Sequence, residues 1–120
     1  MHELALCQSL IDEVESVARR HDALGVHRIR LEIGPLAGVE PPLLEQAFSI
    51  ARAGTLARNA TLEITPQPLR VHCKTCGGES EAKANRLICG RCGDWHTEIV
   101  SGDQMLLTQV ELSLEEENHV

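Results

Sequence analysis

The chain has 120 residues, 42% of them hydrophobic, and its eleven basic and eighteen acidic side chains give a formal net charge of −7. This length fits one compact domain, or one domain with a small accessory module. The negative net charge has the wrong sign for binding a phosphate backbone, so we expect no nucleic-acid partner. No apolar stretch approaches the roughly 18 to 20 residues of a membrane span and no signal-peptide pattern opens the chain, so we expect a cytoplasmic protein with no membrane partner.

The N-terminal segment predicts a long amphipathic helix over residues 3–21. Apolar residues recur there with the helical period, at positions 4, 7, 10, 11, 14, 17 and 18. Gly25 closes the segment. Cys7 lies on the apolar stripe, so we expect a small buried side chain without a chemical role.

The next elements alternate between strand and helix patterns. Apolar and charged residues alternate in HRIRLEIG, which predicts a strand with one buried face. A loop, GPLAGVEPP, precedes a second helix that Pro42 can begin and whose apolar positions include Leu44 and Phe48. Alternation returns in TLEIT and LLTQVELSL, which predict further strands. Together these elements indicate an α+β fold with two helices packed on one face of a small three-stranded sheet.

Four of the five cysteines lie close together in the chain. They form two C-x-x-C pairs separated by twelve residues: Cys73, Cys76, Cys89 and Cys92. Zinc prefers four such donors in a tetrahedron, and each C-x-x-C turn supplies two thiolates on one edge of it. Gly77 and Gly93 directly follow the pairs, where a tight turn benefits from a residue that adopts positive φ. The pattern predicts a structural zinc site, with two disulfides, a redox pair or an iron–sulfur cluster as the competing interpretations.

We expect the cysteines to belong to an inserted, zinc-ribbon-like module over residues 69–100. A segment this short cannot bury enough apolar surface to fold alone, so the metal would act as its core. The predicted organisation is an α+β domain from residues 1–68 plus 101–120, with the zinc domain inserted in it. Charges in the module are nearly balanced and Trp95 is its one stacking residue, which again disfavours nucleic acid.

A second metal-binding pattern lies at the first three residues, Met1, His2 and Glu3. We expect Met1 to be retained, because the aminopeptidase that removes it acts only before small residues. The α-amine, the His2 amide nitrogen and a His2 imidazole nitrogen can then close adjacent chelate rings, a planar set that suits nickel(II) or copper(II), and Glu3 adds a backbone nitrogen or a carboxylate. On this pattern alone an idle chain end is the simpler interpretation, because any chain that begins Met-His carries these donors. The other histidines, His72 and His96 beside the cysteine pairs included, carry no stronger signal.

The combination of motifs is more specific than each one. An N-terminal MHE runs into LCQSLIDEVE, then IRLEIGPLAGVEPPLLEQAF, then the two C-x-x-C pairs. Over essentially its whole length the chain resembles the HypA/HybF family of nickel metallochaperones for nickel–iron hydrogenase maturation. The resemblance implies that His2 is the essential nickel ligand, helped by the Met1 amine and Glu3, and that the four cysteines hold zinc.

The resemblance also implies the function. It is that of a nickel carrier, not an enzyme, which hands Ni(II) to the hydrogenase large-subunit precursor and works with the nickel-pathway GTPase of the same system. A homodimer is compatible with this interpretation. The alternative is a zinc-ribbon adaptor with an idle N-terminus. An enzyme is disfavoured because the chain has no phosphate-cradling glycine loop, no nucleophile paired with a base and no open zinc position.

One position departs from the family pattern, and the role of another position is open. Many members have a histidine directly after the last C-x-x-C, whereas this chain has Gly93 there and His96 three residues on. Members often carry an acidic residue near the nickel site at the place of Glu40, for which we expect at most a supporting role.

Overall fold

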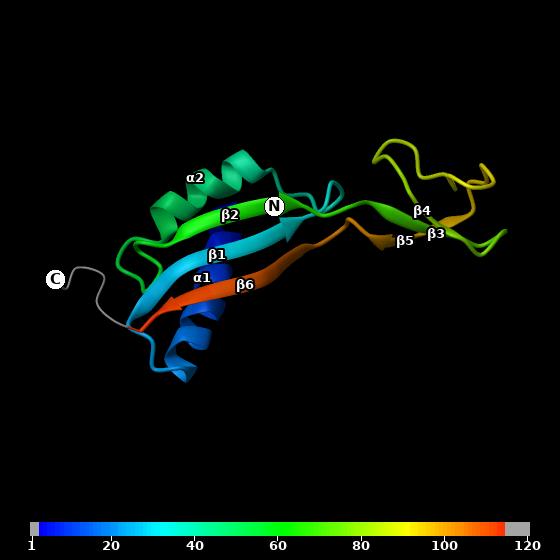
Figure 1. Ribbon diagram of the computed structural model, residues 1–120. Helices are drawn as coiled ribbons and strands as arrows, with labels where there is room; N and C mark the ends of the chain where they lie inside the picture. Colours follow the sequence, from blue (N-terminus) through cyan, green and yellow to red (C-terminus); the bar gives the residue numbers. More distant parts are fainter. Residues whose placement is uncertain (1–2, 115–120) are drawn as a thin grey trace. The chain divides into compact units, whose positions relative to one another are not determined.

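A computed structural model describes residues 3–114 of the chain. The elements in chain order are α1 (Glu3–Arg20), β1 (Gly25–Ile33), α2 (Pro41–Ala51), β2 (Thr61–Pro66), β3 (Arg70–Cys73), β4 (Glu79–Glu81), β5 (Thr97–Ser101) and β6 (Met105–Ser113) (Figure 1). Within this described part, neither helix has the length and apolar character that crossing a membrane requires.

The chain divides into two compact units. The first, here called the helical unit, takes in the chain up to Leu31, Val39–Ile64 and the chain from Leu107 onward. The second, here called the cysteine unit, takes in Glu32–Gly38 and Thr65–Leu106. Whether residues 69–100 fold as a separate domain stays a prediction.

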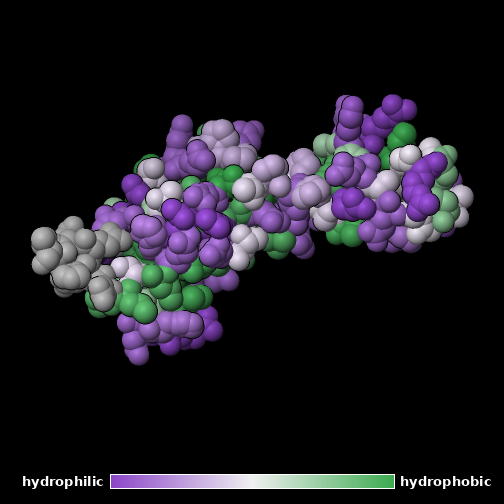
Figure 2. Space-filling view, viewed as in Figure 1, coloured by the Kyte–Doolittle hydropathy of each residue, from purple (hydrophilic) through white to green (hydrophobic). Residues whose placement is uncertain are grey.

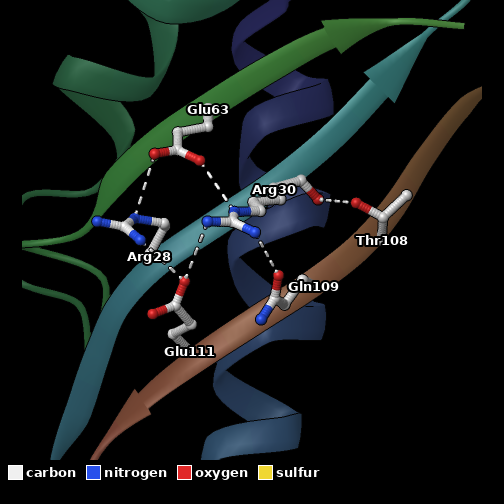
Figure 3. A network of polar contacts seen from close by, with 6 residues as sticks. All are labelled: Arg28, Arg30, Glu63, Thr108, Gln109 and Glu111. Carbon is white, nitrogen blue, oxygen red and sulfur yellow. Dashed lines mark hydrogen bonds and ion pairs between the residues drawn. The ribbon is translucent and has the colours of Figure 1, made fainter.

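The helical unit contains most of a three-stranded sheet of order β2-β1-β6. The arrows of β1 and β2 point the same way and that of β6 points the opposite way, with α1 behind the sheet (Figure 3). Two parallel neighbours need a crossover connection, and α2 supplies it between β1 and β2. The two helices pack against each other. The predicted α+β class, with two helices and a small three-stranded sheet, is confirmed.

The core of the helical unit forms where the helices meet the apolar face of the sheet. The buried side chains recur with period 3.6 in the helices and near period 2 in β1, and include Cys7, Leu10, Ile11, Val14 and Ala18 of α1, Val26, Ile29 and Leu31 of β1, and Leu44, Ala47 and Phe48 of α2. The Cys7 thiol donates a hydrogen bond to the Leu44 carbonyl oxygen, 3.4 Å from its sulfur. Burial raises the pKa of Cys7, and the nearby Glu3 carboxylate adds to the rise. The thiol is thus a buried packing group, as predicted.

The opposite face of this sheet is polar. Arg28 and Arg30 project from β1 between Glu63 of β2 and Glu111 of β6 (Figure 3). Each carboxylate contacts both guanidinium groups, with nitrogen–oxygen distances of 3.3 and 2.9 Å at Glu63 and 3.2 and 3.8 Å at Glu111. Figure 2 shows hydrophilic side chains in the middle of this face. The charged residues that alternate with apolar ones in β1 therefore pair across strands and keep one face of the sheet wet.

The cysteine unit is built on a second, antiparallel sheet of order β4-β3-β5. Few of its described side chains are buried, namely Ile33, Gln67, Leu69, Val71, Cys73 and Cys89. Gln67 is the polar member of this set, and its side-chain oxygen accepts the Gly102 N–H at 2.9 Å. Two of these six buried side chains belong to cysteines, so the sulfur cluster makes up a large part of this small core.

Candidate metal centre

The four cysteines of the C-x-x-C pairs converge on one point. Cys73 ends β3 and Cys76 lies in the turn that follows, while Cys89 and Cys92 lie in the connection between β4 and β5. Their four sulfur atoms all lie within 4.8 Å of one another. In the part of the chain that the structure describes, no other group of three or more His, Cys, Asp or Glu side chains brings its ligand atoms together in this way.

The sulfur spacing fits a tetrahedral zinc ion. A Zn–S bond of about 2.3 Å in a regular tetrahedron places neighbouring sulfurs about 3.8 Å apart. The Cys73 and Cys92 sulfurs are 3.6 Å apart, and those of Cys76 and Cys89 are 3.7 Å apart. Both close pairs join one turn to the other, so a single ion can bind all four thiolates, and the cluster is consistent with a structural zinc.

Backbone amides in each turn point at the first cysteine sulfur. The Cys76 N–H donates to the Cys73 sulfur at 3.4 Å, and the Cys92 N–H donates to the Cys89 sulfur at 3.4 Å. The N–H of Arg91 makes a further bond to Cys89 at 3.3 Å. Such donors stabilise the charged thiolate that a metal requires.

Two glycines close these turns. Gly77 has φ +75° and donates its N–H to the Cys73 carbonyl at 2.9 Å. Gly93 has φ +79° and makes the matching bond to the Cys89 carbonyl at 2.9 Å. A side chain would strain both positions, which is the reason the sequence pattern pointed to them.

The pKa values of Cys73, Cys89 and Cys92 differ because backbone amides and neighbouring sulfurs act on each thiol differently. The Cys76 N–H lowers the pKa of Cys73, and the amides of Cys92 and Arg91 lower the pKa of Cys89 to about 6. The Asp94 N–H lowers the pKa of Cys92. The adjacent Cys73 sulfur, the loss of solvation and the other two sulfurs act in the opposite direction and outweigh this contact, so the pKa of Cys92 is raised to about 12. Crowded sulfurs that cannot all ionise together are the situation that a divalent cation relieves.

The groups around the cluster include one that the sequence did not single out. The Asp94 carboxylate accepts hydrogen bonds from the Thr75 hydroxyl and from the N–H of His96, and together with the imidazole of His96 these contacts hold the pKa of Asp94 well below its usual range. The His96 side chain itself is exposed and contacts Asp94, with 2.7 Å between Nδ1 and the carboxylate. Only its proximity to the last cysteine pair could have drawn attention to Asp94.

Two further residues of open role, His72 and Glu40, are not members of the cysteine cluster. His72 is on β3, in register with Glu79 of β4 and Glu98 of β5. Glu40 precedes α2 and accepts the Leu44 N–H through its backbone carbonyl, while its exposed side chain makes no capping bond.

The predicted nickel donors fall at the edge of the described structure. Met1 and His2 lie outside the described residues. Glu3 is the first residue of α1 and is half-buried. The three residues therefore stay a prediction as a nickel site, and the structure contributes the packed helix that begins at Glu3.

Comparison with known proteins identifies the family. A family model described as "Hydrogenase/urease nickel incorporation, metallochaperone, hypA" matches residues 1–112. Proteins named "Hydrogenase maturation factor HypA" from Nitrosospira multiformis and Aquifex aeolicus are 52% and 40% identical to the chain, over 93% and 96% of its length and 97% and 100% of theirs. The solution structure of the Ni metallochaperone HypA from Helicobacter pylori is 27% identical, with a TM-score of 0.73 over 96% of this chain and 100% of that one.

These matches span both the helical and the cysteine units and include both C-x-x-C pairs. The family is described as one of nickel-incorporating metallochaperones. From the family model, the relatives and the shared fold together, the chain belongs to the HypA family of hydrogenase and urease nickel-incorporation metallochaperones.

Proposed function

We propose that this protein binds Ni(II) at Met1, His2 and Glu3 and delivers it to the large-subunit precursor of a nickel–iron hydrogenase. It acts in the cytoplasm together with the nickel-pathway GTPase of the same maturation system, as a carrier without catalytic activity. The observation that carries the proposal is the family match, which begins at residue 1 and so includes these three residues. The names of the relatives, hydrogenase maturation factors and a Ni metallochaperone, support the same cargo and acceptor.

The chemistry of the first residues supports nickel as the cargo. An amine, a deprotonated amide and an imidazole from adjacent residues give nitrogen donors in one plane, which suits nickel(II) better than the tetrahedral zinc ion. Glu3 adds a backbone nitrogen or a carboxylate. Glu3 begins a helix that is anchored by buried Cys7 and Leu10 within its first turns, so this one of the three proposed donor residues lies on a packed element.

Delivery also requires release, and the proposed donors make release easy. An α-amine titrates at about 7.7 to 8.0 and an imidazole at about 6.5, so protons compete with nickel near neutral pH. The four cysteines serve a different purpose in this proposal. They bind a structural zinc that holds residues 69–100 together, and four thiolates leave no position for cargo or substrate.

The decisive experiment changes the amine without changing any side chain. Isothermal titration with NiCl2, at several pH values, compares the protein with its native N-terminus and the protein with one glycine added ahead of Met1. The addition converts the Met1 amine to a peptide nitrogen, supplies a new amine and moves His2 to third place, so we expect a different nickel site, with a changed affinity and an altered absorption spectrum. The matched control carries the same glycine after Val120 and should bind nickel as the native protein does.

Delivery is measured separately, as nickel transfer to a purified hydrogenase large-subunit precursor with and without the GTPase. We expect transfer from the native protein and reduced transfer from the N-terminally extended one. Identical binding and transfer by both would show that the amine is not a ligand. Absence of nickel binding in the native protein would favour a zinc-ribbon adaptor with an idle N-terminus.

A further inference from the structure

Residues 93–96 connect the second cysteine pair to β5, and backbone groups of Asp94 and His96 in this segment contact both C-x-x-C turns. The Asp94 carbonyl accepts the N–H of Cys89 at 2.8 Å. Two residues later, the His96 carbonyl accepts the N–H of Lys74 at 2.8 Å. Lys74 lies inside the first cysteine pair and Cys89 opens the second, so one short segment is bonded to both turns.

The Asp94 side chain adds a more specific link. One carboxylate oxygen accepts the Thr75 hydroxyl at 2.6 Å, and the other accepts the His96 N–H at 3.0 Å. The His96 Nδ1 lies 2.7 Å from that second oxygen, and the imidazole stacks on Trp95 with ring centroids 3.8 Å apart. Thr75 lies between Cys73 and Cys76, so this carboxylate ties the loop of the first pair to the residues just after the second pair.

We propose that Asp94 is a positioning residue of the zinc site, which locks the two C-x-x-C turns together and thereby slows zinc loss. This inference rests on the assignment of the four cysteines to zinc. Each turn contributes two thiolates, so separation of the turns breaks the four-sulfur set, and the bond between Asp94 and Thr75 opposes that separation. Groups that orient metal ligands from outside the coordination sphere commonly change metal affinity by about 10- to 100-fold.

A second contact between the same parts of the chain provides a matched control. Lys74 of the first turn and Glu98, just beyond the segment, form an ion pair at 3.0 Å. The Glu98 side chain is 63% exposed, whereas that of Asp94 is 24% exposed. Exposed ion pairs contribute little, so Glu98→Ala removes the same charge and a link between the same segments at small expected cost.

The test measures the rate at which zinc passes from the full-length, zinc-loaded protein to an excess of a chromogenic zinc chelator. The variants are Asp94→Ala, Thr75→Val, the double variant and Glu98→Ala. We expect release about tenfold faster or more from Asp94→Ala, an intermediate rate from Thr75→Val, and little further change on combining the two, since both remove one contact. Glu98→Ala should stay within about twofold of the wild-type rate.

Wild-type rates in both Asp94→Ala and Thr75→Val would overturn the inference, as would an equal acceleration by Glu98→Ala. If Asp94→Ala is purified without zinc, the rate of Thr75→Val decides the question. The zinc content of the wild-type protein is measured first, by metal analysis. Wild-type protein without stoichiometric zinc would refute the assignment of the four cysteines, and that result is distinct from a failure of the Asp94 link.

Discussion

Leu44→Ala should strongly destabilise the helical unit and leave the cysteine unit intact. Leu44 is 0% exposed and lies on α2 in the core shared with α1. The change removes three carbon atoms, worth about 2.4 kcal/mol at about 0.8 kcal/mol per buried carbon, and a residual cavity raises the usual cost of Leu→Ala to about 2 to 5 kcal/mol. At about 4 to 8 °C per kcal/mol for a unit of this size, a cost of about 2 to 5 kcal/mol should lower the melting temperature by about 8 to 40 °C.

Two probes separate the units in one sample. Far-UV circular dichroism follows α1 and α2, which belong to the helical unit, while Trp95 is the only tryptophan of the chain and belongs to the cysteine unit. The dichroism transition of zinc-loaded Leu44→Ala should shift down while Trp95 fluorescence at room temperature stays that of the wild type. The control is Leu43→Ala, because this neighbour is 42% exposed and should cost less than about 1 kcal/mol. An unchanged transition for Leu44→Ala, or an equal shift for both variants, would refute the packing argument.

Three further outcomes are expected. Cys89→Ala should abolish stoichiometric zinc binding and change Trp95 fluorescence, because the sulfur cluster makes up much of the small core of the cysteine unit. Helix content should stay near the wild-type level. A variant that keeps its zinc on metal analysis would contradict the four-sulfur assignment. His2→Ala should abolish tight nickel binding in calorimetry and change the free energy of unfolding by no more than about 0.5 kcal/mol, so a large loss of stability would count against a role as a nickel ligand. Arg30 and Glu63 form an ion pair with a nitrogen–oxygen distance of 2.9 Å. A double-mutant cycle of Arg30→Ala and Glu63→Ala should give a coupling energy of about 0.2 to 1 kcal/mol that decreases in high salt. A coupling energy that salt does not change would rule out an exposed electrostatic contact.

Local patterns predicted most of the helical unit because its elements are amphipathic. The predicted helix over residues 3–21 corresponds to α1, Glu3–Arg20, and the HRIRLEIG strand corresponds to β1, Gly25–Ile33. In both, a repeating set of apolar residues faces the core, and the repeat is visible in the sequence alone.

The cysteine cluster was equally accessible to sequence reasoning. Each C-x-x-C turn presents two thiolates at a spacing set by its own backbone, and the glycine after each turn marks the positive φ that it needs. The nickel donors at Met1, His2 and Glu3 rest on donor chemistry and family membership, and they stay a prediction that the N-terminal extension experiment tests.

Tertiary structure decided how the pieces are joined. The parallel pairing of β1 with β2, the antiparallel place of β6 beside β1 and the short strands β3, β4 and β5 carry no local pattern strong enough to predict them. Asp94 and Thr75 are 19 residues apart in the chain, and their contact exists only because the two cysteine turns are brought to one point. Periodicity and ligand spacing are properties of a short stretch of chain, whereas strand order and the Asp94 link depend on contacts between distant residues, which form only when the whole unit folds.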